Sequence, residues 1–307
     1  MKDRINRRDF IKHSVAAGVV TAAGTLSFPS SLFGSILSPG IDISVVNGAE
    51  YFDNTIKAVK LLGGMEKFVS RGNKVGLLIN SPWNKPGTYT NPDVALAVLK
   101  MCVDEGASEI YSIENARTSY WKRSNLYGKM KNEVSQIQTT DEKKTVKIEK
   151  GKYLKEAEVY LPFLECDVLI NIPIVKNHQG TNFTCNLKNV MGACSRTTCR
   201  TFHQGNGAKG FYDDPDFLSR CIADVQYLRV PNLCVVDATE FVLTNGPAGP
   251  GELKKENKIV AGANCVSVDA YCAALLGLTP NDVSMIRYAG ENGIGETDLK
   301  KLTIKEV

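Results

Sequence analysis

The sequence predicts an α/β fold built on a mostly parallel sheet with helices on both of its faces. Three observations support this prediction. Short runs of β-branched residues alternate along the chain with longer segments whose apolar residues recur every three or four positions. The short runs are almost wholly apolar, which is typical of strands buried on both faces. Glycine, asparagine and proline separate the two kinds of segment, as turns and helix ends require.

Six strands are expected, each a short run rich in valine and isoleucine that favours extended backbone. They are expected at residues 42–48, 73–80, 108–115, 166–175, 232–239 and 257–263. The helices are predicted from the spacing of apolar side chains and from glycine or asparagine at their ends. They are expected at residues 51–64, 91–107, 183–193, 213–228, 266–278 and 282–293. The polar residues 139–152 predict a surface excursion, and residues 196–210 a glycine-rich polar loop.

Residues 1–40 are expected to be a targeting signal and linker, followed at 41–307 by one α/β domain whose division into two lobes stays open. The paired Arg7 and Arg8, followed by a lysine and a weakly apolar run, resemble a twin-arginine signal. We therefore expect the twin-arginine translocase as a partner and a periplasmic or otherwise exported location. Prolines and glycines interrupt the apolar run, so no stable membrane span is expected.

The charge of the chain disfavours a nucleic-acid partner. Residues 1–28 carry five basic and two acidic side chains, which accounts for +3 of the net charge of +4 of the whole chain. The remainder is close to neutral, whereas binding to phosphate backbones needs a concentrated basic surface.

The nine cysteines fall into two groups. Six have apolar neighbours and are expected to be small buried hydrophobes, namely Cys102, Cys166, Cys221, Cys234, Cys265 and Cys272. The other three, Cys185, Cys194 and Cys199, have neither ferredoxin nor zinc-finger spacing. Together with His178 or His203 they are candidate ligands of a metal ion or an iron–sulfur cluster. The alternatives are surface thiols or a bridge between the second and third of these cysteines.

In open α/β sheets, ligands bind beyond the carboxyl ends of the strands. The loops that follow the strand residues 74–80, 167–175 and 232–236 are rich in asparagine, threonine, glycine and proline. None of the three matches a dinucleotide fingerprint or a P-loop, so a dinucleotide-dependent dehydrogenase is not expected.

The segments LLINSPWNKPGTYTNPDV, INIPIVKNHQGTNFTCNLKNVMGA and VVDATEFVLTNGPAGPGE resemble, in this order, the family known as domain of unknown function 362. The resemblance covers residues 72–292, and a K-x-H segment followed by T-x-x-x-K-N is its most specific part. Some members carry cysteine runs that bind iron–sulfur clusters, and these runs are absent here. The family is similar to lactate-racemase-type proteins, whose nickel-bearing cofactor is held by Lys and His. By analogy, the resemblance implies that Lys176, His178, Lys188 and His203 are the candidates for holding such a cofactor.

A pocket for a small anionic ligand is predicted where the strand at 166–175 ends. Lys176 and His178 follow this strand directly, and the next helix begins near Thr184. The exposed N–H groups of a helix N-terminus and a nearby lysine favour a carboxylate or phosphate. Cys185, Lys188, Asn189 and Gly192 fall at spacings of three and four residues, so this set is expected on one face of that helix, with Lys188 and Asn189 toward the pocket. A histidine on such a loop can act as acid, base or metal ligand.

Further candidates come from the neighbouring segments. Asp237 directly follows the apolar strand residues 232–236, where α/β enzymes often carry an acid or a metal ligand. The remaining ligand-binding candidates are Asn80, Thr90, Arg196, Arg200 and Gly246. The leading hypothesis is an exported enzyme, with or without a metal, that binds a small anionic substrate. An iron–sulfur or redox protein and a non-catalytic periplasmic binding or assembly protein are the alternatives.

Overall fold

The computed structural model describes residues 40–205, 210 and 214–307, and Gly40–Val307 form one compact unit. The predicted twin-arginine signal therefore lies outside the described residues, apart from Gly40. Within the part of the chain that is described, no helix has the length and hydropathy that a membrane span requires.

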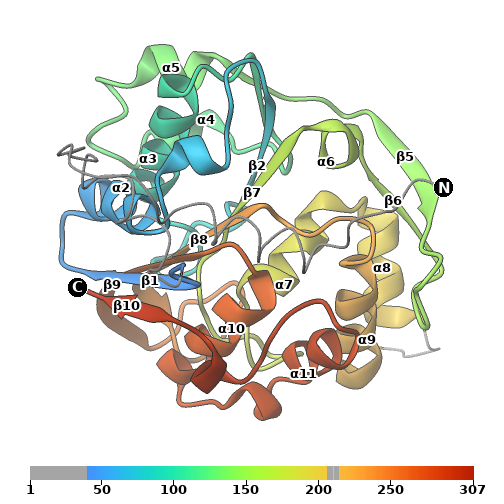
Figure 1. Ribbon diagram of the computed structural model, residues 1–307. Coiled ribbons are helices and arrows are strands. Elements are labelled where there is room, and N and C mark those ends of the chain that lie inside the picture. The colour runs from blue at the N-terminus through green and yellow to red at the C-terminus, as the bar shows by residue number, and fades with distance from the viewer. Residues whose placement is uncertain (1–39, 206–209, 211–213) are drawn as a thin grey trace, which may run out of the picture. The chain divides into compact units, whose positions relative to one another are not determined.

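An eight-stranded sheet of order β10-β1-β9-β8-β7-β2-β3-β4 forms the centre of this unit (Figure 1). Its strands are β1 (Ile43–Asn47), β2 (Lys74–Ile79), β3 (Glu109–Ser112), β4 (Ile137–Gln138), β7 (Val168–Ile172), β8 (Leu233–Val242), β9 (Leu253–Gly262) and β10 (Ile304–Glu306). Only β9 runs against the other strands of this sheet. The connection from β8 to β9 is too short for a crossover helix, so the two strands pair antiparallel. The predicted α/β fold is confirmed.

Helices cover both faces of the sheet, as Figure 1 shows for the blue helix α2 and the red helices α10 and α11. The α-helices are α2 (Tyr51–Leu61), α3 (Pro92–Asp104), α4 (Thr118–Trp121), α5 (Lys131–Ser135), α6 (Leu161–Glu165), α7 (Asn186–Asn189), α8 (Arg196–Gln204), α9 (Pro215–Val225), α10 (Cys265–Ala273) and α11 (Ser284–Glu291). Short 3-10 turns are η1 (Met65–Lys67), η2 (Val190–Ala193), η3 (Ala274–Leu276), η4 (Pro280–Asp282) and η5 (Leu299–Lys301). Leu77 of β2 packs in the core under α2 and α3, whereas Leu78 faces the core beneath α7, α9, α10 and α11.

Two predicted segments differ from the structure near the site. The helix expected at 183–193 is shorter, because α7 begins at Asn186 and continues into the 3-10 turn η2. The polar loop expected at 196–210 is wrong in its first part, which forms α8. The Ser195 hydroxyl accepts a hydrogen bond from Thr198 N at 3.2 Å and so caps this helix.

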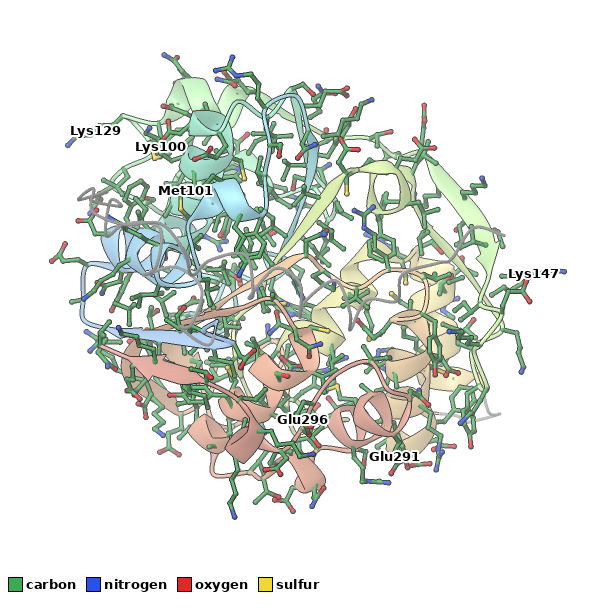
Figure 2. The ribbon with its side chains drawn as sticks, viewed as in Figure 1. Lys100, Met101, Lys129, Lys147, Glu291 and Glu296 are labelled. Atoms are coloured by element: carbon green, nitrogen blue, oxygen red, sulfur yellow. The ribbon has the colours of Figure 1, made fainter. Side chains whose placement is uncertain are left out.

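The polar residues 139–152 contribute an exposed strand, β5 (Lys143–Lys147), which pairs antiparallel with β6 (Glu156–Tyr160) in a separate two-stranded sheet. Figure 2 shows the Lys147 side chain pointing outward from this ribbon. The predicted surface excursion is thus confirmed, and β6 contacts both α6 and α8.

Candidate functional site

A cavity of about 300 Å³ lies beyond the carboxyl ends of β2, β3 and β7, and we call it the inner cleft. The chain leaves β2 toward β3 and leaves β7 toward β8, so the connections diverge between these two neighbouring strands. Ligands of open α/β sheets bind at such a point. The inner cleft is lined by Asn80, Trp83, Glu114, Lys176, His178, Thr184, Lys188, Asn189, Met191, Gly192, Cys199, His203 and Pro247.

Lys176 and Glu114 both line the inner cleft, and each influences the pKa of the other. Burial lowers the pKa of Lys176 to about 7, and the nearby Lys188 adds to this effect while Glu114 opposes it. Burial raises the pKa of Glu114 to about 7, against the influence of Lys176. Both groups therefore exchange protons near neutral pH, which is the range that general acid–base catalysis requires.

A chain of buried side-chain hydrogen bonds runs beneath the inner cleft, and each member donates to the next. In order, its members are Lys176, Asn80, Asn189, Asn171, Asn186 and Asp269. The successive donor–acceptor distances are 3.0, 2.9, 2.7, 3.2 and 2.9 Å. The chain begins at an ammonium group and ends at a carboxylate, so each bond polarises the next in the same direction. This network fixes the two cleft-lining amides, Asn80 and Asn189.

The N-terminus of α7 is already occupied by a carboxylate of the chain itself. Asp269 accepts hydrogen bonds from the backbone N–H groups of Asn186 and Leu187, at 2.8 and 2.9 Å. These are the N–H groups that the sequence assigned to a bound anion, and Asp269 satisfies them instead. Burial raises the pKa of Asp269 to about 6, while its hydrogen bonds oppose the rise.

Lys188 projects from α7 into the wall of the inner cleft, with 9% of its surface exposed. Among the described residues, its ammonium group has no carboxylate within 4.0 Å, and it contacts the Met191 sulfur at 3.4 Å. Burial lowers the pKa of Lys188 to about 8. The hydroxyl of Thr184, in the same wall, is buried and makes no hydrogen bond within the described residues. A cation and a hydroxyl are therefore available to a ligand.

His178 is held in one tautomer by the backbone of its own loop. Its Nδ1 accepts a hydrogen bond from Gly180 N at 3.0 Å. In the neutral imidazole the other nitrogen, Nε2, then carries the proton and can donate it. Burial lowers the pKa of His178 to about 2, and the neighbouring Lys188, His203 and Lys176 contribute in the same direction. His178 is therefore a neutral hydrogen-bond donor.

We predict that the His178 imidazole does not titrate between pH 5 and pH 8, since burial and nearby cations disfavour its charged form. Two-dimensional ¹⁵N–¹H spectra of the full chain, with ¹⁵N-labelled histidine, should show Nε2 protonated throughout this range. A His178→Gln variant assigns the signals. A midpoint near pH 6.5 for His178 would contradict the prediction.

The other predicted site residues lie outside the inner cleft. Asp237 accepts hydrogen bonds from the backbone N–H groups of Asn91 and Thr239 at 2.6 and 2.9 Å, at the start of α3. Burial raises the pKa of Asp237 to about 6. The Thr90 hydroxyl donates to Ile172 O at 2.8 Å. Both residues hold the loop after β2 in place.

Gly246 supports the wall of the inner cleft through its backbone. A Cβ atom at this position would lie 1.7 Å from the carbonyl oxygen of Asn177, so only glycine fits. This close approach places Pro247 in the wall. Arg196 lines a second cavity that adjoins the inner cleft, whereas Arg200 lines neither of these two cavities.

The predicted metal ligands do not form a metal site in the described residues. His178, His203 and Cys199 line the inner cleft, but Cys185 lies in the core beside Asp269 and Cys272. No group of three His, Cys, Asp or Glu side chains is placed to hold a metal ion in the described part of the chain. A histidine that binds metal through Nε2 uses Nδ1–H as a donor, whereas Nδ1 of His178 is an acceptor. The described residues thus show no metal site, and metal binding stays a prediction.

All nine cysteines are free thiols, and the six expected in apolar surroundings are buried. Burial raises the pKa of Cys199 to about 11, so its thiol is protonated at neutral pH.

Sequence reasoning missed Glu114 and Trp83. Glu114 follows β3 by two residues, and the rule that residues after a strand face the ligand could have found it. Trp83 follows β2 and is 38% exposed, in the wall of the cleft.

The fold and the site together define an open α/β protein with a cationic cleft at the carboxyl ends of its central strands. The chain belongs to the family described as Domain of unknown function (DUF362), whose model matches residues 74–274. It is similar to the thylakoid-associated protein sll1697 of Synechocystis sp., with 22% identity over 245 residues, 77% of this chain and 73% of the relative.

Two solved structures show a partial similarity. The lactate racemase apoprotein from Thermoanaerobacterium thermosaccharolyticum aligns with a TM-score of 0.44 and 13% identity over 75% of this chain. A Thermotoga maritima protein aligns with a TM-score of 0.35 and 16% identity over 62% of this chain. The alignments span 58% and 51% of those chains, respectively.

Proposed function

We propose that this protein is an enzyme that binds a small organic carboxylate or phosphate in the inner cleft and transfers a proton to or from it. The proposal depends mainly on the environment of Lys188. Its ammonium group is almost buried in the cleft wall and has no carboxylate partner among the described residues. A buried cation without a counter-charge costs free energy, and a bound anion removes that cost.

The surrounding groups suit this ligand. The neutral His178 lines the same cleft, and the Thr184 hydroxyl makes no hydrogen bond within the described residues. Glu114 and Lys176 both have pKa values of about 7, so either can hold the proton that the reaction moves. The site of action is proposed to lie outside the cytoplasm, on the basis of the predicted twin-arginine signal alone.

Replacing Lys188 with methionine is expected to weaken the binding of inorganic phosphate at pH 7 by about 10- to 100-fold, because a charge-assisted hydrogen bond is lost. Calorimetric titration of the full chain in two buffers of different ionisation enthalpy measures both affinity and proton exchange. The bound anion raises the pKa of neighbouring lysines, so wild-type binding should take up part of a proton.

The control is Lys129→Met, which removes an equally charged but exposed side chain (Figure 2). It should bind phosphate as the wild type does. Equal affinity of the Lys188→Met variant and the wild type, with both folded, would refute the proposed anion site.

A further inference from the structure

The inner cleft opens into a larger cavity of about 790 Å³, which we call the outer cleft. The two share walls formed by Trp83, Glu114, Met191, Gly192 and Cys199, so they are parts of one depression. Ligand sites of roughly 300–1,000 Å³ hold molecules of drug size. A single carboxylate or phosphate group at Lys188 would leave most of this space unfilled.

Arginines dominate the charge of the outer cleft. Arg117, Arg123 and Arg196 line it, together with the carboxylates of Glu114 and Asp141. Among the described residues, none of these three arginines forms an ion pair within 4.0 Å. The fork of donors on a guanidinium group matches carboxylate and phosphate oxygens.

Arg123 is held in position before any ligand binds. Its guanidinium carbon lies 4.1 Å from the ring centroid of Tyr89, in a cation–π contact. One of its terminal nitrogens donates to the carbonyl oxygen of Trp83 at 3.3 Å. These two contacts restrict the side chain, so binding costs less rotamer entropy. Its remaining N–H groups make no hydrogen bond to the described residues, so they can serve a second anion.

Apolar side chains form part of the wall that the two cavities share, beside Glu114. Trp83 lines both parts of the cleft and is 38% exposed, and Met191 lies in the same shared wall. An exposed indole between two sets of cations suits the uncharged middle of a ligand.

We propose that the cleft binds an elongated organic acid with two anionic ends, one at Lys188 and the other at Arg123. The second end is a carboxylate or a phosphate, and the uncharged middle lies against Trp83. This inference rests on the proposed function and adds the class of substrate.

The test compares two-ended with one-ended ligands of equal length. Straight-chain dicarboxylates and ω-phosphonocarboxylates of four to eight carbons are titrated against the full chain, beside the matching monocarboxylates and inorganic phosphate. At least one two-ended ligand should have an affinity at least about tenfold higher than that of its one-ended counterpart. The better of the two series identifies the second anion as carboxylate or phosphate.

Arg123→Gln should reduce the affinity difference between two-ended and one-ended ligands to less than twofold. The affinity for one-ended ligands should stay within twofold of the wild-type value. Arg200→Gln, which changes an exposed arginine outside the cleft, should keep the advantage. Lys188→Met should weaken both kinds of ligand.

The outcomes separate this inference from the proposed function. Binding of one-ended ligands without any two-ended advantage, or an advantage that survives in Arg123→Gln, overturns the two-ended substrate alone. Failure of phosphate and all acids to bind the wild type overturns both proposals.

Discussion

Replacing Asp269 with alanine is expected to lower the free energy of unfolding by about 3–5 kcal/mol and to weaken phosphate binding in the inner cleft. Its carboxylate accepts from Asn186 N, Asn186 Nδ2 and Leu187 N, at 2.8, 2.9 and 2.9 Å in the core. Each buried donor left without an acceptor costs about 1–3 kcal/mol. The same bonds hold the start of α7, which carries Lys188, so the cation should lose its position.

Asp224→Ala is the matched control, because Asp224 also accepts three hydrogen bonds in a buried position. Its donors are the backbone N–H groups of Lys152, Tyr153 and Leu154, at 2.8, 2.6 and 3.0 Å. Asp224 does not line the inner cleft. Urea unfolding should show comparable losses of stability in the two variants, whereas calorimetry should show weaker phosphate binding only for Asp269→Ala. Unchanged binding in that variant would contradict a positioning role for Asp269.

The second large effect concerns the dependence of stability on pH. The pKa of Lys176 is about 7 in the folded chain, compared with 10.5 for an ordinary lysine. Between these values the unfolded chain binds more protons, so the free energy of unfolding rises with pH. The rise that Lys176 contributes is about 1.5 kcal/mol between pH 7 and pH 8.5, since one proton gives at most about 1.4 kcal/mol per pH unit.

Lys176→Met should remove this contribution. In the variant, Glu114 loses a nearby cation and its pKa rises further above the ordinary value. Its deprotonation then destabilises the folded state in the same pH window, which adds to the difference between the two proteins. Urea unfolding at several pH values from 7 to 8.5 should show the wild type gaining stability relative to the variant. Parallel curves would mean that Lys176 keeps an ordinary pKa in the folded chain.

The buried thiols do not obscure this comparison. Burial raises the pKa of Cys102 and Cys221 to about 12, and both retain their protons in the folded state above the range where free thiols ionise. Such groups lower the stability of the folded chain as pH rises, but equally in the wild type and the variant. The difference between the curves therefore reports on Lys176 and its partner Glu114.

Local sequence patterns were sufficient to predict the position of several cleft residues. Lys176 and His178 follow an apolar strand, and the ligand position at strand ends is a general property of open α/β sheets. Glu114 also follows a strand, but the residues next to it in the sequence do not indicate that it lies near a lysine 62 positions away. His203 was assigned to a loop because the glycines after it hide the helix that precedes them.

The sequence by itself determined the α/β class, the order of most strands and helices and the presence of lysine and histidine at one strand end. These features depend on residue spacing and on neighbours along the chain, which the sequence displays directly. Only the tertiary structure decided that Asp269 occupies the N-terminus of α7, 83 positions away, and that Glu114 faces Lys176. It also placed Trp83 in the same cleft as the lysines and Arg123 in the adjoining outer cleft. Hydrogen bonds and burial join residues that are distant in sequence, and packing of the whole chain sets those partners and their pKa values.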